Sequence, residues 1–402
     1  RELFTDPKLQ ALIETGLQNN TDLNIARLKV TEAEATLMTS RLAYLPSISF
    51  EPSGTLRSVD GNAMTKSYDI AASASWEVDI FGKLTNAKRG AKAALEQSEA
   101  YRQAVQTQLI ATIANSYYSL LMLDAQLDIS ERTAANWGEN VRAMKALKAA
   151  GDATELAVAQ SEASKLSVDA SIASLRQQID QMENTLTALL GIAPQKIDRT
   201  TIGEQRFPTE LAAGVPLQLL QRRPDVRQSE AALAQAFYAT NAARAAFYPS
   251  ITLSGSAGWT NAAGAAITNP GQWLFTAVGS LVQPLFNRGK NIANLRIAKA
   301  QQEEALLSFR QSLLDAGTDV NNALIQWQTA RQRQQIDQQQ ILSLESTVRS
   351  SELLMQYSSQ NYLEVLTARQ TLLQAELTAV SDRFDEIQGV INLYHALGGG
   401  AE

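Results

Sequence analysis

The stretch Asp-Ile-Ala-Ala-Ser-Ala-Ser-Trp-Glu-Val-Asp-Ile, residues 69–80, has apolar side chains at even positions and mostly polar ones at odd positions. A period of two is typical of a β-strand with one side against hydrocarbon and the other in water. Residues 251–260 alternate in the same way, and the flanking segments 47–58 and 272–286 are weaker partners. The sequence therefore predicts two β-hairpins, over residues 44–82 and 248–287.

The prolines show where long helices can form. They occur at residues 7, 46, 52, 194, 208, 216, 224, 249, 270 and 284. Residues 53–193 and 285–402 therefore contain none, and proline costs about 3 kcal/mol inside a helix. Apolar spacings of three, four and seven residues, as from Leu366 to Tyr394, favour coiled-coil packing. We expect helices over residues 85–150, 152–190, 291–357 and 361–397.

The two halves of the chain resemble each other. Leu45-Pro46-Ser47-Ile48-Ser49 returns as Tyr248-Pro249-Ser250-Ile251-Thr252, Asp79-Ile80-Phe81 as Pro284-Leu285-Phe286, and Leu189-Leu190-Gly191 as Ala396-Leu397-Gly398. The offsets of 203, 205 and 207 residues indicate an internal tandem repeat with small insertions. We expect an α+β chain in which residues 1–191 and 224–402 each form a helix, a hairpin, a very long helix and a second helix. Residues 192–223 would be the linker between them.

Composition argues against several classes of protein. The chain has no cysteine and a single histidine, His395, which we expect at a helix end. This excludes thiolate metal sites and makes hydrolase triads improbable. A formal charge of −6 argues against a nucleic-acid binder, and no phosphate loop appears. We expect no enzyme, no metal site and no cofactor.

The small number of predicted strands requires several chains to assemble. Four strands are too few to close a transmembrane barrel, and open strand edges are not tolerated in lipid. A barrel would have to be shared between chains, and three copies would supply twelve strands. We therefore expect a homotrimer with cyclic symmetry, in which the barrel continues into a tube of coiled-coil helices.

Several longer motifs carry a family resemblance. They run in order along almost the whole chain: Asp6-Pro7-Lys8-Leu9, Trp76-Glu77-Val78-Asp79-Ile80-Phe81-Gly82-Lys83, Leu219-Leu220-Gln221-Arg222-Arg223-Pro224-Asp225-Val226-Arg227, Ala245-Ala246-Phe247-Tyr248-Pro249-Ser250-Ile251, and Val390-Ile391-Asn392-Leu393-Tyr394-His395-Ala396-Leu397-Gly398-Gly399-Gly400. With these motifs the chain resembles the TolC-like outer membrane factors, which are the exit ducts of bacterial tripartite efflux pumps.

The resemblance implies a fold, a location and partners. The fold is a trimer with a shared 12-stranded β-barrel in the outer membrane of a Gram-negative bacterium and an α-helical barrel in the periplasm. The implied function is passive conduction of drugs, with a periplasmic adaptor and an inner-membrane transporter as partners. Arg222-Arg223-Pro224-Asp225 resembles the branch that works with resistance-nodulation-division pumps. Many members begin with a lipidated cysteine, so a lipid anchor would precede Arg1 or have been removed.

The resemblance also implies a gate at the periplasmic helix tips. Leu363 matches the family's apolar ring, and Thr367 stands where many members carry an aspartate, which argues against a strong cation-selective ring. Glu364 could replace that charge in part, and Asp152 and Glu155 lie near the corresponding break in the first half. The alternative for the acids is a structural one, because carboxylates at a helix start interact favourably with the helix dipole.

Other residues receive mainly structural interpretations. Trp76, Trp259 and Trp273 lie in strand segments and are expected at the membrane interface. Trp137 and Trp327 would pack in the coiled coils. Arg222, Arg223, Pro224 and Asp225 are expected to organise a helix start. Gly90, Gly138 and Gly317 could mark close helix packing.

The sequence leaves three other functions open. The same architecture could serve type I protein secretion or heavy-metal efflux, although the methionines are scattered. A soluble coiled-coil scaffold is the alternative of a different class, and the alternation in residues 69–80 argues against it.

Overall fold

The structure is a computed structural model of residues 1–402 and describes all of them except 1–3, 59–63, 208–221, 262–271, 358–361 and 400–402. The chain forms two compact units, each built from separated segments. Unit 1 contains residues 1–26, 102–224 and 313–402, and unit 2 contains residues 27–101 and 225–312.

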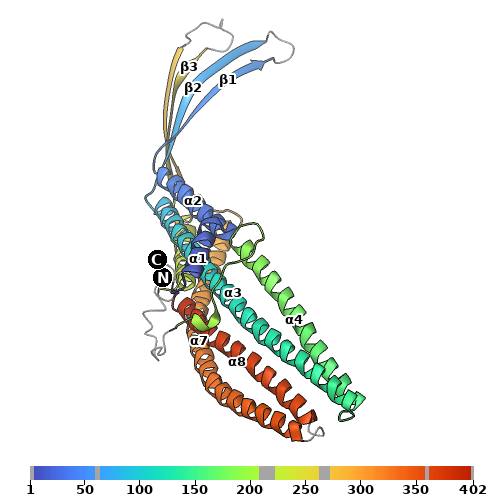
Figure 1. Ribbon diagram of the computed structural model, residues 1–402. Coiled ribbons are helices and arrows are strands. Elements are labelled where there is room, and N and C mark those ends of the chain that lie inside the picture. The colour runs from blue at the N-terminus through green and yellow to red at the C-terminus, as the bar shows by residue number, and fades with distance from the viewer. Residues whose placement is uncertain (1–3, 59–63, 208–221, 262–271, 358–361, 400–402) are drawn as a thin grey trace. The chain divides into compact units, whose positions relative to one another are not determined.

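Unit 2 contains a four-stranded antiparallel sheet in the order β1-β2-β3-β4, with its strands side by side in Figure 1. The strands are β1 (Ser47–Arg57), β2 (Thr65–Val78), β3 (Ser250–Thr260) and β4 (Gln272–Val282). Both predicted hairpins are present, and β2 pairs with β3 to join them. The predicted strand over residues 69–80 ends early, because the Asp79 carboxylate accepts hydrogen bonds from the backbone N–H groups of Leu84 and Thr85 and so caps the next helix.

The strand register gives the sheet two chemically different faces. Trp76 lies opposite Leu253, and Ile70 lies opposite Trp259, which in turn lies opposite Trp273. Residues opposite one another point to the same side of a sheet, so these apolar side chains share a face. The other face is rich in hydroxyl groups, and most of them are serines: Ser47, Ser49, Ser73, Ser75, Ser254, Ser256 and Thr276.

Four of the helices are much longer than usual in globular proteins, and these four match in pairs. They are α1 (Pro7–Asn19), α2 (Thr21–Leu42), α3 (Lys83–Ala150), α4 (Glu155–Leu189), the short 3-10 helix η1 (Ile202–Glu204), α6 (Pro224–Ala245), α7 (Lys290–Tyr357) and α8 (Tyr362–Ala396). α3 and α7 both have 68 residues, and α4 and α8 both have 35. Within the described residues, no helix has a stretch apolar enough to span a bilayer.

The first half begins with two helices where one was expected. Asn20 separates α1 from α2: its backbone N–H donates to Gly16 O, and its side-chain oxygen accepts from Leu23 N. Its amide also donates to Leu189 O at the end of α4. One residue thus ends α1 with its backbone, caps α2 with its side-chain oxygen and bonds to the end of α4 with its side-chain amide.

The core of unit 1 lies where α1, α3, α4 and α8 meet. Its fully buried side chains include Leu9, Tyr117, Leu121, Leu186 and Ile387. Farther along the helices, Trp137 is buried against Val168 and Ile172, and Trp327 is also buried, so the prediction that both tryptophans pack in the coiled coils is confirmed.

The predicted glycines do not mark the closest helix contacts. A Cβ added to Gly317 would meet nothing within 4 Å, and those added to Gly90 and Gly138 would make ordinary contacts. A Cβ at Gly16 would lie 2.5 Å from the end of the Ile113 side chain, and a Cβ at Gly389 would lie 2.9 Å from the backbone of Trp327, which cannot rotate away. Within a single chain the prediction for Gly317 is therefore wrong, since a Cβ there would meet no other atom.

Candidate functional site

The turn between α3 and α4 is built by a glycine and a cap. Gly151 has φ +91, a backbone conformation that favours glycine. Gly151 N donates to Lys148 O and Asp152 N to Leu147 O, which is the Schellman pattern at a helix C-terminus. Thr154 then caps α4 by accepting from Ala157 N. These bonds make residues 151–154 a turn, and α4 begins at Glu155 where the sequence suggested 152.

The first turn of α8 packs onto this end of α3 and α4. Tyr362 is buried with Met144 of α3 and Val158 of α4. Its hydroxyl lies 2.7 Å from the Ser161 hydroxyl, which donates to Asn140 Oδ1 over 3.2 Å. Both Ser161 and Asn140 are buried, so the Tyr362 hydroxyl completes a buried polar network that joins three helices.

A hollow of about 380 Å³ lies beside this contact. Asp152 and Leu363 both line it, together with Leu156 from α4. Leu363 is 58% exposed and Leu156 is 66% exposed. Two leucines are therefore presented to solvent next to a carboxylate at the end of the helix pair.

The structure brings together only part of the predicted gate. Leu363 and Asp152 line the same hollow, whereas Glu364 and Thr367 lie exposed on α8 outside it. Thr367 donates its hydroxyl to Leu363 O, and Glu155 forms an ion pair with Lys148. Sequence reasoning missed Tyr362, although it directly precedes Leu363.

The comparisons with known proteins agree along the whole chain. The family described as "Outer membrane efflux protein" matches residues 12–192 and 215–399. The cation efflux system protein CusC of Escherichia coli is 30% identical over 406 residues, covering 100% of this chain and 88% of that protein. The pyoverdine export outer membrane protein OpmQ of Pseudomonas putida is 31% identical over 411 residues, covering 99% and 87%.

A solved structure gives the same result for the fold. The open state of the MtrE outer membrane channel of Neisseria gonorrhoeae has a TM-score of 0.91 and 29% identity, covering 100% of this chain and 91% of that one. The chain belongs to the outer membrane efflux protein family.

Membership in the outer membrane efflux protein family settles the class of protein. The chain is an outer-membrane efflux channel protein of the Gram-negative cell envelope and not an enzyme. The soluble scaffold considered from the sequence is therefore wrong. The substrates of the relatives differ, because their names specify cations in one case and pyoverdine in another.

The Arg-Arg-Pro-Asp motif of this efflux protein lies at the start of α6 and contacts α7 and α8. Arg223 is buried and donates to Ala396 O at the end of α8 and to the Asp319 carboxylate of α7. Pro224 is the first residue of α6, where its missing N–H costs nothing. Arg222 and Asp225 are exposed. A single buried guanidinium thus holds the end of α8 against α7.

The three strand tryptophans lie at two levels of the sheet. Trp259 and Trp273 are a cross-strand pair with ring centroids 4.5 Å apart, at the loop ends of β3 and β4. Trp76 lies opposite Leu253, six residues along β3 from Trp259. At about 3.4 Å per residue the two levels are roughly 20 Å apart, close to the height of about 25 Å of the apolar band in barrels.

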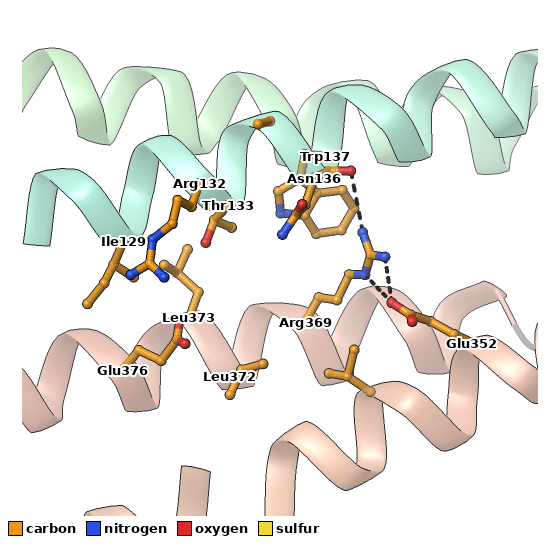
Figure 2. Close-up of a pocket in the computed structure, with 12 residues that line it drawn as sticks. Ile129, Arg132, Thr133, Asn136, Trp137, Glu352, Arg369, Leu372, Leu373 and Glu376 are labelled. Carbon is orange, nitrogen blue, oxygen red and sulfur yellow. Dashed lines mark hydrogen bonds and ion pairs between the residues drawn. The ribbon is translucent and has the colours of Figure 1, made fainter. Parts of the chain in front are cut away.

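A second groove lies between α3 and the α7–α8 pair (Figure 2) and has a volume of about 390 Å³. Arg369 crosses it, with an ion pair to Glu352 and a long hydrogen bond to Asn136 O. Burial raises the pKa of Glu376, which also lines the groove, and the nearby Arg132 acts in the opposite direction. The groove therefore combines leucines with charges of both signs.

Proposed function

We propose that three copies of the chain form a passive exit duct for a tripartite drug efflux pump, with a gate at the helix tips. The sheet carries this proposal. Its edge strands β1 and β4 each have one neighbour, and unsatisfied strand edges are not tolerated in lipid. Pairing β4 of one copy with β1 of the next would satisfy them and close a barrel of twelve strands.

The two faces of the sheet fit such a barrel. Large apolar side chains such as Ile48, Phe50, Trp273 and Phe275 are exposed in the single chain, and we place them against lipid. The hydroxyl-rich face would then line water. Each half of the chain would contribute two strands and one pair of long helices, and the equal lengths of those helices support the proposed duplication.

The gate would consist of exposed side chains carried on a fixed support. Leu363 is the proposed apolar ring, with Asp152 beside it, while Glu364 and Thr367 face solvent on the same helix. The buried contact of Tyr362 with Ser161 would hold the start of α8 against α4. Opening would therefore require this contact to break or move.

The proposed partners follow from the passive nature of the duct. A channel supplies no energy, so an inner-membrane transporter of the resistance-nodulation-division class would drive export and a periplasmic adaptor would connect the two. The likeness to CusC favours metal cations as a second candidate cargo. Expression in a bacterium without its own exit duct would separate the two, since tolerance to drugs or to metal cations should return according to the cargo.

The internal repeat predicts how neighbouring copies would pair. Within the chain, Ala71 of β2 lies opposite Gly258 of β3. The offset of 203 residues maps β1 onto β3 and therefore Gly258 onto Thr55. Because Ser47 lies opposite Ser75 and Ser250 lies opposite Val282, the offset from β2 to β4 is then 207 residues, which maps Ala71 onto Val278. Val278 should therefore face Thr55 of the next copy. Both positions lie on the hydroxyl-rich face of the sheet, so the mapped register preserves the two faces.

Disulfide formation tests this pairing directly, because the natural chain has no cysteine. A chain carrying Thr55→Cys and Val278→Cys should form covalent trimers of about 131 kDa from chains of 43.7 kDa. Two strands separate these positions within one chain, which is too far for an internal bridge. The control, Ser53→Cys with Val278→Cys, shifts the register by two residues and should react more slowly. Equal and slow reaction of both pairs would contradict the shared barrel.

A further inference from the structure

Two acidic side chains face each other inside the coiled coil. Asp337 belongs to α7 and Asp382 to α8, and only 7% and 5% of their surfaces are exposed. The two carboxyl groups lie close enough to share a hydrogen bond. Asp337 Oδ2 is buried and receives no hydrogen bond from any donor in the described part of the chain. Buried acids normally have partners, so this pair requires an explanation.

The neighbouring charges do not neutralise the pair. Arg333, one turn before Asp337 on α7, contacts Asp382, but the same guanidinium group also binds the half-buried Asp385. One cation is therefore divided between the carboxylates of Asp382 and Asp385. Two ionised carboxylates at hydrogen-bond distance repel each other strongly, and burial makes the repulsion worse.

The other elements packed nearby contribute mainly neutral groups. From α3, Gln126 donates to Ser381 Oγ. From α7, Gln334 donates to Asp382 O and to Glu386 Oε2, and the charge of Glu386 is already paired with Arg383. Arg383 in turn donates to Gln205 O of the linker. None of these contacts supplies a second cation to Asp337 and Asp382.

A shared proton resolves the conflict. If one carboxyl group keeps its proton, it donates to the other, and the repulsion becomes a hydrogen bond between the two helices. The electrostatics agree, because burial, followed by the hydrogen bond with Asp337, raises the pKa of Asp382 to about 6 although Arg333 opposes the shift. The titration belongs to the pair and not to either residue alone.

We propose that Asp337 and Asp382 share one proton and so form a contact between α7 and α8 that is stronger in acid. We call this contact the clasp. The protonated clasp stabilises the helix pair in acid. This contribution is fully present below the ordinary pKa of an aspartate and is lost as the pH rises through about 6. The α7–α8 pair is therefore held more tightly at pH 5 than at pH 7.5.

The clasp has a consequence for conduction, which rests on the proposed function. Tip helices that must move to open the duct would move more easily at neutral pH than in acid. The position of the clasp suits this role, since Asp382 lies 20 residues, or roughly 30 Å, along α8 from Tyr362. The clasp would therefore restrain the α7–α8 pair at a point far along the helices from the gate residues.

Hydrogen exchange of the full chain in detergent tests the clasp. Amides around residues 333–341 and 378–386 are followed at pH 5.0 and 7.5, with correction for the intrinsic exchange rate. We expect about threefold to tenfold greater protection at pH 5.0. In the Asp337→Asn variant an amide replaces the shared proton as donor, so protection at pH 7.5 should rise and the dependence on pH should disappear.

The Asp385→Asn variant is the matched control, because it removes one charge from the same Arg333 outside the buried pair. It should keep the dependence on pH. Equal protection of the natural chain at both pH values, or an unchanged dependence in the Asp337→Asn variant, would overturn the proposal. Exchange does not require conduction, so a failure of the duct proposal would leave this result interpretable.

Discussion

The hydroxyl of Tyr362 lies 2.7 Å from the hydroxyl of Ser161, which joins the first turn of α8 to the second turn of α4. The Tyr362→Phe variant removes this bond and keeps the buried ring. We expect a loss of about 1 kcal/mol in local stability and a larger open fraction of channels in planar bilayer recordings.

A double-mutant cycle assigns this effect to the pair. Ser161→Ala alone should act in the same direction, and the two changes together should cost less than their sum. Simple additivity would show that Tyr362 acts through packing and not through the Ser161 hydroxyl.

The exposure of Leu363 separates gating from folding. Because this side chain is 58% exposed, Leu363→Ala should change the thermal unfolding midpoint little. If Leu363 forms the proposed ring, single-channel conductance should rise. Leu166→Ala, at an exposed leucine of α4, is the control, and an equal rise in that variant would refute the assignment.

Two glycines make a matched pair for stability. A Cβ at Gly389 would lie 2.9 Å from backbone atoms of Trp327, whereas a Cβ at Gly317 would meet nothing within 4 Å. Gly389→Ala should therefore destabilise the chain by about 1–3 kcal/mol through overpacking. Gly317→Ala should stabilise it by up to about 1 kcal/mol, since alanine favours a helix. Denaturant unfolding in detergent measures both, and two changes of the same sign would contradict the packing.

Asp6 should make the fold sensitive to acid. Burial acts to raise its pKa, but hydrogen bonds from Thr200, Tyr117, the backbone of Lys8 and Gln205 outweigh burial and lower the pKa below its ordinary value. Stability from these bonds is present above the ordinary pKa and is lost as the pH falls below about 4. Asp6→Asn should lower the unfolding midpoint at pH 7 and flatten its fall between pH 5 and pH 3.

The exposed Asp198 provides the control for Asp6. Its only side-chain partner among the described residues is Lys8, in an exposed ion pair, and such pairs contribute little. Asp198→Asn should leave the profile unchanged. If both variants gave the same profile, the buried hydrogen bonds of Asp6 could not be the cause of the acid sensitivity.

The strands could be predicted because their cause is local. Alternation from Ile70 to Val78 is written in consecutive residues, and so are the proline-free runs of the long helices. The residues at which these elements end were harder to predict from the sequence. Asp79 could have extended β2 by its position, but it ends the strand as the cap of α3. The cap by Asn20 was missed for the same reason, since an isolated asparagine does not reveal which backbone groups it will reach.

Contacts between helices depend on residues far apart in the sequence, and most of them could not be predicted from it. Gly389 and Gly317 look alike in the sequence, and only the partner helix distinguishes them. Asp337 and Asp382 are separated by 45 residues, with no motif to connect them. The resemblance to a family did locate the end of the helix pair, but it pointed to the exposed Leu363 and not to the buried Tyr362 that supports it.

The equal lengths of α3 and α7, and of α4 and α8, restrict how this protein can change over evolutionary time. One inserted residue moves everything after it by 1.5 Å along a helix and turns it by about 100°. An insertion in one long helix alone would therefore break its seam with its partner and leave one tip longer than the other. Length changes should be tolerated only as matched sets of whole heptads in all four helices, so the span of the helices would drift far more slowly than their sequence.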